Sequence, residues 1–127
     1  MKRKTRTITV NDQQYVWWYK IGEECAIIHF SPFNDKTSKI TVKFCFEHKN
    51  TFDAQPHFAD IYPEYIIMKK DNKEYRIKTV EPKMASLILS YLSYDAFISR
   101  KNITYNGLDL LSKMGYIISE VKEGWYW

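Results

Sequence analysis

Four side chains that could bind a metal ion or act as acid/base groups, His48, Asp53, His57 and Asp60, fall within one irregular stretch, residues 47–63. Imidazole and carboxylate are common ligands for divalent metals in proteins. Their spacing matches neither the HExxH pattern nor an EF-hand loop, so nothing forces them onto one ion. We therefore rank these four residues as weak metal candidates and predict instead a solvated loop anchored by its two phenylalanines.

Cysteine and histidine also occur together in the strand-like run CAIIHF, residues 25–30. Alternation puts Cys25 and His29 on one face, but four residues of extended chain separate them by about 13 Å, too far for a nucleophile and its base. Cys45 could meet either of them from a neighbouring strand. Free cysteine is usually a small buried hydrophobe, so we predict two free thiols in a reduced, cytoplasmic setting and a buried, hydrogen-bonded histidine.

No segment carries a signature of covalent or cofactor chemistry. The G-x-S-x-G motif, a glycine-rich phosphate loop and a dinucleotide fingerprint are missing, and four glycines leave little room for one. The 127 residues fit one compact domain, and hydrophobic and charged fractions of 45% and 27% are those of a globular chain. We expect a single domain, residues 1–127, that is not an enzyme, holds no cofactor and does not enter a membrane.

The basic excess of the sequence lies at its start. The formal charge is +4, from 19 basic and 15 acidic residues, and Lys2, Arg3, Lys4 and Arg6 account for all of the excess. We expect residues 1–6 to form a basic, flexible arm that could contact phosphate groups. Nucleic-acid binding through this arm, exposed aromatic residues and a C-terminal helix and hairpin is therefore the alternative function.

The first part of the chain predicts three β-hairpins and an antiparallel sheet. Alternation is clearest in KITVKFCF, residues 39–46, where apolar side chains at every second position predict one buried face. The run CAIIHF precedes it across a loop rich in Pro, Asn, Asp and Ser. Asn and Asp, which tolerate left-handed backbone, separate two further pairs of strand-like runs, at residues 11–12 and 71–72.

The aromatic run YVWWYKIG, residues 15–22, follows the same alternation. Its uninterrupted apolar face would form a large exposed patch if left in water, so we predict it in the core. That face consists of Tyr15, Trp17, Tyr19 and Ile21. Trp18, on the opposite face beside Lys20, is then the ring most available to a partner.

Helical spacing replaces strand alternation from Thr79 onward. Apolar residues recur at the i, i+3, i+4 positions of a helix that packs on a sheet, at Met84, Leu87, Ile88, Tyr91 and Leu92. A threonine cap and a proline in the first turn mark its start. No charged residue lies between Met84 and Tyr94, and the opposite side carries Ser86, Ser90 and Ser93. We interpret this small, uncharged face as a candidate interface with a second subunit or another protein.

A shorter helix is predicted over residues 105–114, capped by Asn106 or Thr104 and ended by Gly115. A strand follows, and KEG, residues 122–124, would turn it into the closing WYW. The residues Leu110, Leu111 and the run 114–117 resemble the end of a winged-helix domain, which implies DNA binding. The chain before this helix is too short for the second helix of that fold, so we assign no family.

These patterns predict an α+β protein with about seven or eight mainly antiparallel strands, three hairpins first, and two helices in the C-terminal part that pack on one face. We expect a binding protein whose partner is another protein or a second copy of itself, in an accessory, inhibitor or immunity-type role. The protein-interface candidates are Ser86, Ser90, Ser93, Trp18, Trp125 and Trp127.

Overall fold

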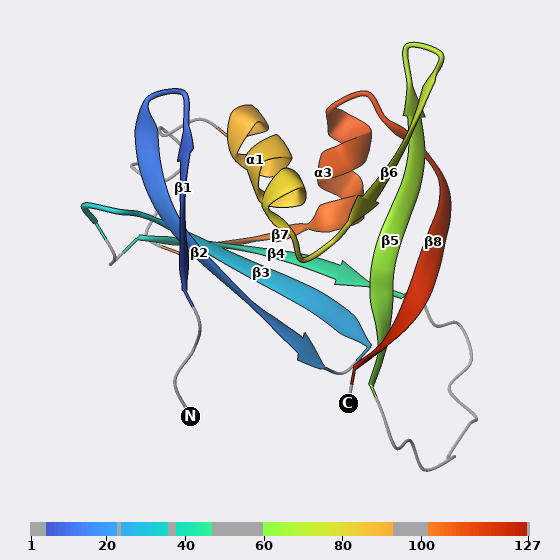
Figure 1. Ribbon diagram of the computed structural model, residues 1–127, viewed down its shortest axis with the longest axis horizontal. Helices are drawn as coiled ribbons and strands as arrows, with labels where there is room; N and C mark the ends of the chain where they lie inside the picture. The colour runs from blue at the N-terminus through green and yellow to red at the C-terminus, as the bar shows by residue number, and fades with distance from the viewer. Residues whose placement is uncertain (1–4, 23, 36–37, 47–59, 93–101, 127) are drawn as a thin grey trace.

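The computed structural model describes residues 5–22, 24–35, 38–46, 60–92 and 102–126 (Figure 1). Within these ranges the chain forms eight strands, mostly antiparallel, and two helices. The predicted α+β class and the number of strands are thus confirmed. The expectation of one sheet is wrong, because the strands divide between two sheets.

The larger sheet has five strands in the order β1-β2-β3-β4-β7. Antiparallel pairing joins β1 to β2, β2 to β3 and β3 to β4, whereas β7 pairs with β4 in parallel. The sequence analysis did not predict β7, which is short and lies beside a strand far from it in sequence. The bounds of the five strands are β1 (Arg6–Val10), β2 (Gln13–Gly22), β3 (Cys25–Pro32), β4 (Lys39–Cys45) and β7 (Asn102–Asn106).

The smaller sheet has three antiparallel strands in the order β6-β5-β8: β5 (Asp60–Lys70), β6 (Lys73–Lys78) and β8 (Ile117–Tyr126). Because β5 begins at Asp60, the irregular stretch predicted to reach residue 63 ends earlier. The predicted turn at residues 122–124 is also wrong, since β8 runs through them. Gly124 is needed there for close strand packing, because a Cβ on it would lie 2.6 Å from the Cβ of Glu64.

Two-residue turns join β1 to β2 and β5 to β6. Asn11 and Asp12 have φ values of 51° and 63°, and Asp71 and Asn72 have values of 53° and 64°. Left-handed backbone at both central residues matches the right-handed twist of the flanking strands. The Asn and Asp signals in the sequence mark these two turns.

The helices α1 (Pro82–Tyr91) and α3 (Gly107–Lys113) lie between the two sheets (Figure 1). α1 contacts β1 and β6, and α3 contacts β4, β7 and β8, so each helix touches both sheets. The predicted packing of both helices on one face of a single sheet is therefore corrected. None of the described helices is long and apolar enough to cross a bilayer.

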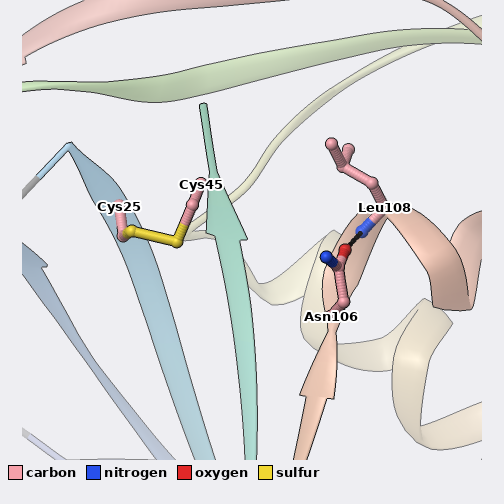
Figure 2. The surroundings of a disulfide bond; sticks show 4 residues. All are labelled: Cys25, Cys45, Asn106 and Leu108. Atoms are coloured by element: carbon pink, nitrogen blue, oxygen red, sulfur yellow. Dashed lines mark hydrogen bonds between the residues drawn. A yellow bond between two sulfur atoms is a disulfide. The ribbon is translucent and has the colours of Figure 1, made fainter. Parts of the chain in front are cut away.

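The two helices start differently from one another. At α3 the predicted cap is present: the side-chain oxygen of Asn106 accepts a hydrogen bond from the amide of Leu108 at 3.0 Å (Figure 2). The same oxygen accepts a second hydrogen bond from the amide of Asp109 at 3.2 Å. At α1 the predicted threonine cap is wrong. Thr79 is fully buried and donates its hydroxyl to the carbonyl of Pro63 at 2.7 Å, so it ties the start of the helix to β5.

The core combines residues of both sheets and both helices, with Trp17, Phe30 and Phe44 among its largest fully buried side chains. Tyr15 and Ile21 are buried beside Trp17, as the alternation of β2 predicts. Tyr19, predicted on the same buried face, is instead 36% exposed, and nothing in the structure explains its departure.

Candidate binding face of the five-stranded sheet

The five-stranded sheet has one side toward the helices and one side away from them. Burial along β3 shows which residues lie on each side. Ala26, Ile28 and Phe30 are fully buried and point into the core. Successive side chains of a strand alternate between faces, so Cys25 and the other odd-numbered residues of β3 lie on the opposite side. We call that side the outer face.

Cys25 and Cys45 are directly opposite each other in the β3–β4 ladder and form a disulfide bond (Figure 2). Both residues are half-buried on the outer face. The prediction of two free, buried thiols is therefore wrong. Two half-buried cysteines at one end of a ladder are close enough to bond, and only the register of β3 against β4 reveals that proximity.

Trp18, His29 and Thr41 form a row across β2, β3 and β4. The indole of Trp18 stacks on the imidazole of His29, with ring centroids 5.3 Å apart and 27° between the planes. His29 Nδ1 lies 2.9 Å from Thr41 Oγ1. The predicted hydrogen bond of His29 is thus present, but its side chain is half-buried on the outer face rather than in the core.

The next row of the outer face places Ile27 between two lysines. Lys20 on β2 and Lys43 on β4 are both opposite Ile27 in their ladders, and both are exposed. Ile27 itself is half-buried, like the adjacent disulfide. We call the half-buried residues that lie along and beside the central strand the β3 strip: Trp18, Cys25, Ile27, His29 and Cys45.

Carboxylates are missing from the described part of this face. No aspartate or glutamate occupies an outward position in the five described strands of the sheet. The edge strands contribute exposed threonines there, Thr7 on β1 and Thr104 on β7. The nearest acids in sequence are Glu23 and Glu24, which follow β2 and precede β3. Around Ile27 the outer face therefore has an apolar centre and two flanking ammonium groups, with neutral polar residues on the edge strands. Toward the other end of the face, Val16, Ser31 and Thr41 are buried.

Three of the other interface candidates, Ser86, Ser90 and Trp125, belong to elements outside this sheet. On α1, Ser86 is half-buried and Ser90 is exposed, and the Ser90 hydroxyl donates to the carbonyl of Ser86 at 2.8 Å. Trp125 is in β8, where it pairs with Ile61 of β5. Ser93 and Trp127 lie outside the described residues. Of the four candidates within the described residues, Trp18 alone lies in the β3 strip.

The predicted metal and nucleic-acid residues fall mostly outside the described ranges. His48, Asp53 and His57 are there, as are Lys2, Arg3 and Lys4. Asp60 is the first residue of β5. Arg6 begins β1 rather than ending a free arm, and its guanidinium carbon lies 5.5 Å from the centroid of the Trp17 ring. Among the described residues no three His, Cys, Asp or Glu side chains converge on a possible metal position.

An open depression of about 390 Å³ lies beside β8 and is lined by Phe46 and residues 120–123. Its lining side chains are all exposed or half-buried, and they mix two glutamates with one lysine. A ligand-binding cleft normally encloses its ligand and holds it with a few converging polar groups. This depression is open and has no converging polar groups, so it is a weaker candidate for a binding site than the outer face.

Comparison with known proteins finds no family model that matches the chain, no similar curated protein and no similar solved structure. The sequence pattern predicts that Trp18 shares a face with Lys20, but it does not reveal Ile27 between Lys20 and Lys43, because that relation depends on which residues face each other across three strands.

Proposed function

We propose that this protein is a non-catalytic interaction protein that binds an acidic protein partner through the outer face. The observation that supports this proposal is the row in which Ile27 lies between Lys20 and Lys43, on a face whose described outward strand positions carry no carboxylate. An accessory, inhibitor or immunity-type role is compatible with such a surface, by analogy alone.

The order of side chains across the sheet matches the anatomy of protein interfaces. Interfaces have an apolar, aromatic-rich centre from which charges are depleted, surrounded by a polar periphery. Here the β3 strip lies on and beside the central strand, the lysines lie on the two flanking strands and the threonines lie on the edge strands. A partner could therefore bury Ile27 and the Trp18 ring while its acidic groups meet the lysines.

The charge of the outer face favours a different protein over a second copy of this chain. In a two-fold dimer the same patch meets itself, which would bring the Lys20 and Lys43 ammonium groups of both copies together. Like charges placed opposite each other disfavour association. Self-association through the serine face of α1 stays a separate prediction: an unchanged solution mass on Ser90→Glu substitution would remove it.

The test is capture of proteins from the native cells on the tagged full-length chain. We expect the variant Lys20→Glu/Lys43→Glu to lose at least ten-fold of the specifically retained protein. The matched control Lys73→Glu/Lys113→Glu makes the same charge change at two exposed lysines that are not part of this sheet, on β6 and at the end of α3, and it should retain the protein like the wild type.

Two outcomes would contradict the proposal. Equal retention by the two double variants would place the binding surface elsewhere. Loss of retention on nuclease treatment of the extract would support the alternative function, nucleic-acid binding, instead.

The cytoplasmic location expected from the sequence remains a prediction. The disulfide weighs against it, because disulfides persist mainly in oxidising compartments and are rare in the cytosol of mesophiles.

A further inference from the structure

On the three-stranded sheet, the face opposite the core carries basic side chains of β6 and β8 around one tyrosine of β5. Tyr65 of β5 is directly opposite Lys78 of β6 and Lys122 of β8. The guanidinium carbon of Arg76 lies 4.5 Å from the centroid of the Tyr65 ring, and the Lys78 ammonium lies 5.5 Å from it. We call Tyr65, Arg76, Lys78 and Lys122 the Tyr65 cluster.

Two of the positive charges of this cluster, those of Arg76 and Lys78, lie close together. Within the described part of the chain, no carboxylate forms a salt bridge with Arg76, Lys78 or Lys122. The charged groups of Arg76 and Lys78 instead lie over the Tyr65 ring. Arg76 and Lys78 are exposed, and Lys122 is half-buried. A bound anion would offset the repulsion between the Arg76 and Lys78 charges.

The positive surface is a narrow track that crosses the strands. Lys78 and Lys122 are two strand spacings apart, roughly 10 Å. In the next row, about 7 Å along β5, Ile67 is opposite both Arg76 and Glu120. The Arg76 guanidinium extends from that row back over the Tyr65 ring, away from Glu120 in the ladder. On the other side, the carboxylate of Glu81 accepts a hydrogen bond from the backbone amide of Lys78 at 3.0 Å. A broad acidic protein surface or a duplex would meet these carboxylates, whereas a single strand along the track would not.

We propose that the Tyr65 cluster binds the phosphate groups of a single-stranded nucleic acid. Stacking on Tyr65 orients the Arg76 guanidinium, whose planar array of donors can bind two phosphate oxygens at once. The two lysines supply point charges along the same track. This site lies on a different sheet from the β3 strip and does not depend on the proposed protein partner.

The experiment is fluorescence anisotropy of the full-length chain with a labelled, mixed-sequence DNA strand of about 12 nucleotides. We expect log K to fall with log salt concentration with a slope of about −2, since three phosphate contacts contribute about 0.7 each. Lys78→Gln and Lys122→Gln should each reduce that slope by about 0.7 and weaken binding several-fold at about 50 mM salt.

Two further variants test whether binding depends on the planar shape of the Arg76 side chain and on the position of the charge. Arg76→Lys keeps the charge but loses the planar donor array, so we expect weaker binding with the slope nearly retained. Lys73→Gln removes a charge at the exposed start of β6, away from the Tyr65 ring, and should bind like the wild type. Circular dichroism spectra that match the wild type will show that each variant is folded.

Three results would overturn the site. The first is no binding at about 50 mM salt, where phosphate contacts are strong. The second is wild-type binding by Lys78→Gln and Lys122→Gln, with loss in the variant Lys2→Gln/Arg3→Gln/Lys4→Gln, which would assign binding to the N-terminal residues. The third is full displacement by polyglutamate at equal charge, which would indicate an acidic polypeptide as the ligand.

Discussion

Lys20 and Lys43 lie on opposite sides of the central strand β3, each directly opposite Ile27 in its own ladder. Since neighbouring strands are about 4.8 Å apart, the two lysine backbones are separated by roughly 10 Å. A partner that buries Ile27 would therefore place acidic groups within reach of both ammonium groups at once.

Ile27 and Ile28 are adjacent residues on opposite faces of β3, and they should respond differently to truncation. Ile28 is fully buried, so Ile28→Ala should lower the free energy of unfolding by about 2 to 5 kcal/mol. Ile27→Ala should lower it by less than about 1 kcal/mol but weaken partner binding by about 1 to 2 kcal/mol. Urea unfolding and titration with the captured partner measure the two effects. Equal losses of unfolding free energy in Ile27→Ala and Ile28→Ala would show that Ile27 is buried within the protein and is not available to a partner.

Reduction of the Cys25–Cys45 bond should destabilise the fold. The cysteines are 20 residues apart in sequence, and the chain-entropy value for a loop of that size is about 3 kcal/mol. Urea unfolding with and without reductant measures the difference. The variant Cys25→Ser/Cys45→Ser should be insensitive to reductant. Native protein whose thiols react with a thiol reagent before reduction would contradict the disulfide.

Gly107, the first residue of α3, packs against a ring that cannot move away. A Cβ at this position would lie 2.6 Å from Cδ1 of Phe44, whose side chain is fully buried. We therefore expect Gly107→Ala to lower the free energy of unfolding by about 1 to 3 kcal/mol. Gly22→Ala is the matched control, because nothing lies within 4 Å of the position that its new methyl group would take. The control should stay within about 0.5 kcal/mol of the wild type in thermal or urea unfolding.

The Asn106 side chain should contribute measurably to the stability of α3. Its oxygen accepts the amide hydrogens of Leu108 and Asp109, and loss of such a cap typically costs about 1 kcal/mol. Asn106→Ala should show that loss in urea unfolding, whereas Asn106→Asp keeps an acceptor and should show much less. Equal destabilisation by both variants would mean that the side-chain amide, not the cap, matters.

Tyr62 should make stability depend on pH in the alkaline range. Burial, reinforced by the nearby Glu64 carboxylate, raises the pKa of Tyr62 to about 12. In the unfolded chain a tyrosine ionises near pH 10, so ionisation favours unfolding between about pH 10 and 12. The stabilisation that comes from keeping Tyr62 protonated is fully present below pH 10, and it is lost as the pH rises toward 12. The wild type should lose about 2 kcal/mol more than Tyr62→Phe between about pH 8 and 11.5 in urea unfolding. Equal losses of unfolding free energy in the wild type and Tyr62→Phe would contradict the assignment of this pH dependence to Tyr62.

The sequence by itself determined the local elements of this protein, because they depend on neighbouring residues. Asn11 and Asp12 specify a tight turn whatever surrounds them, and Asn106 can cap a helix with its own following amides. The alternation of β2 likewise separated Trp17 from Trp18, since successive side chains of any strand point to opposite faces.

Only the tertiary structure decided which elements meet. The division into two sheets, the parallel pairing of β7 with β4 and the register of β3 depend on how helices and sheets bury their apolar faces together. That register joins Cys25 to Cys45 and places Ile27 between Lys20 and Lys43. A shift of β3 by one residue would turn Cys25 and Ile27 to the other face, so no local pattern in the sequence could reveal the binding face.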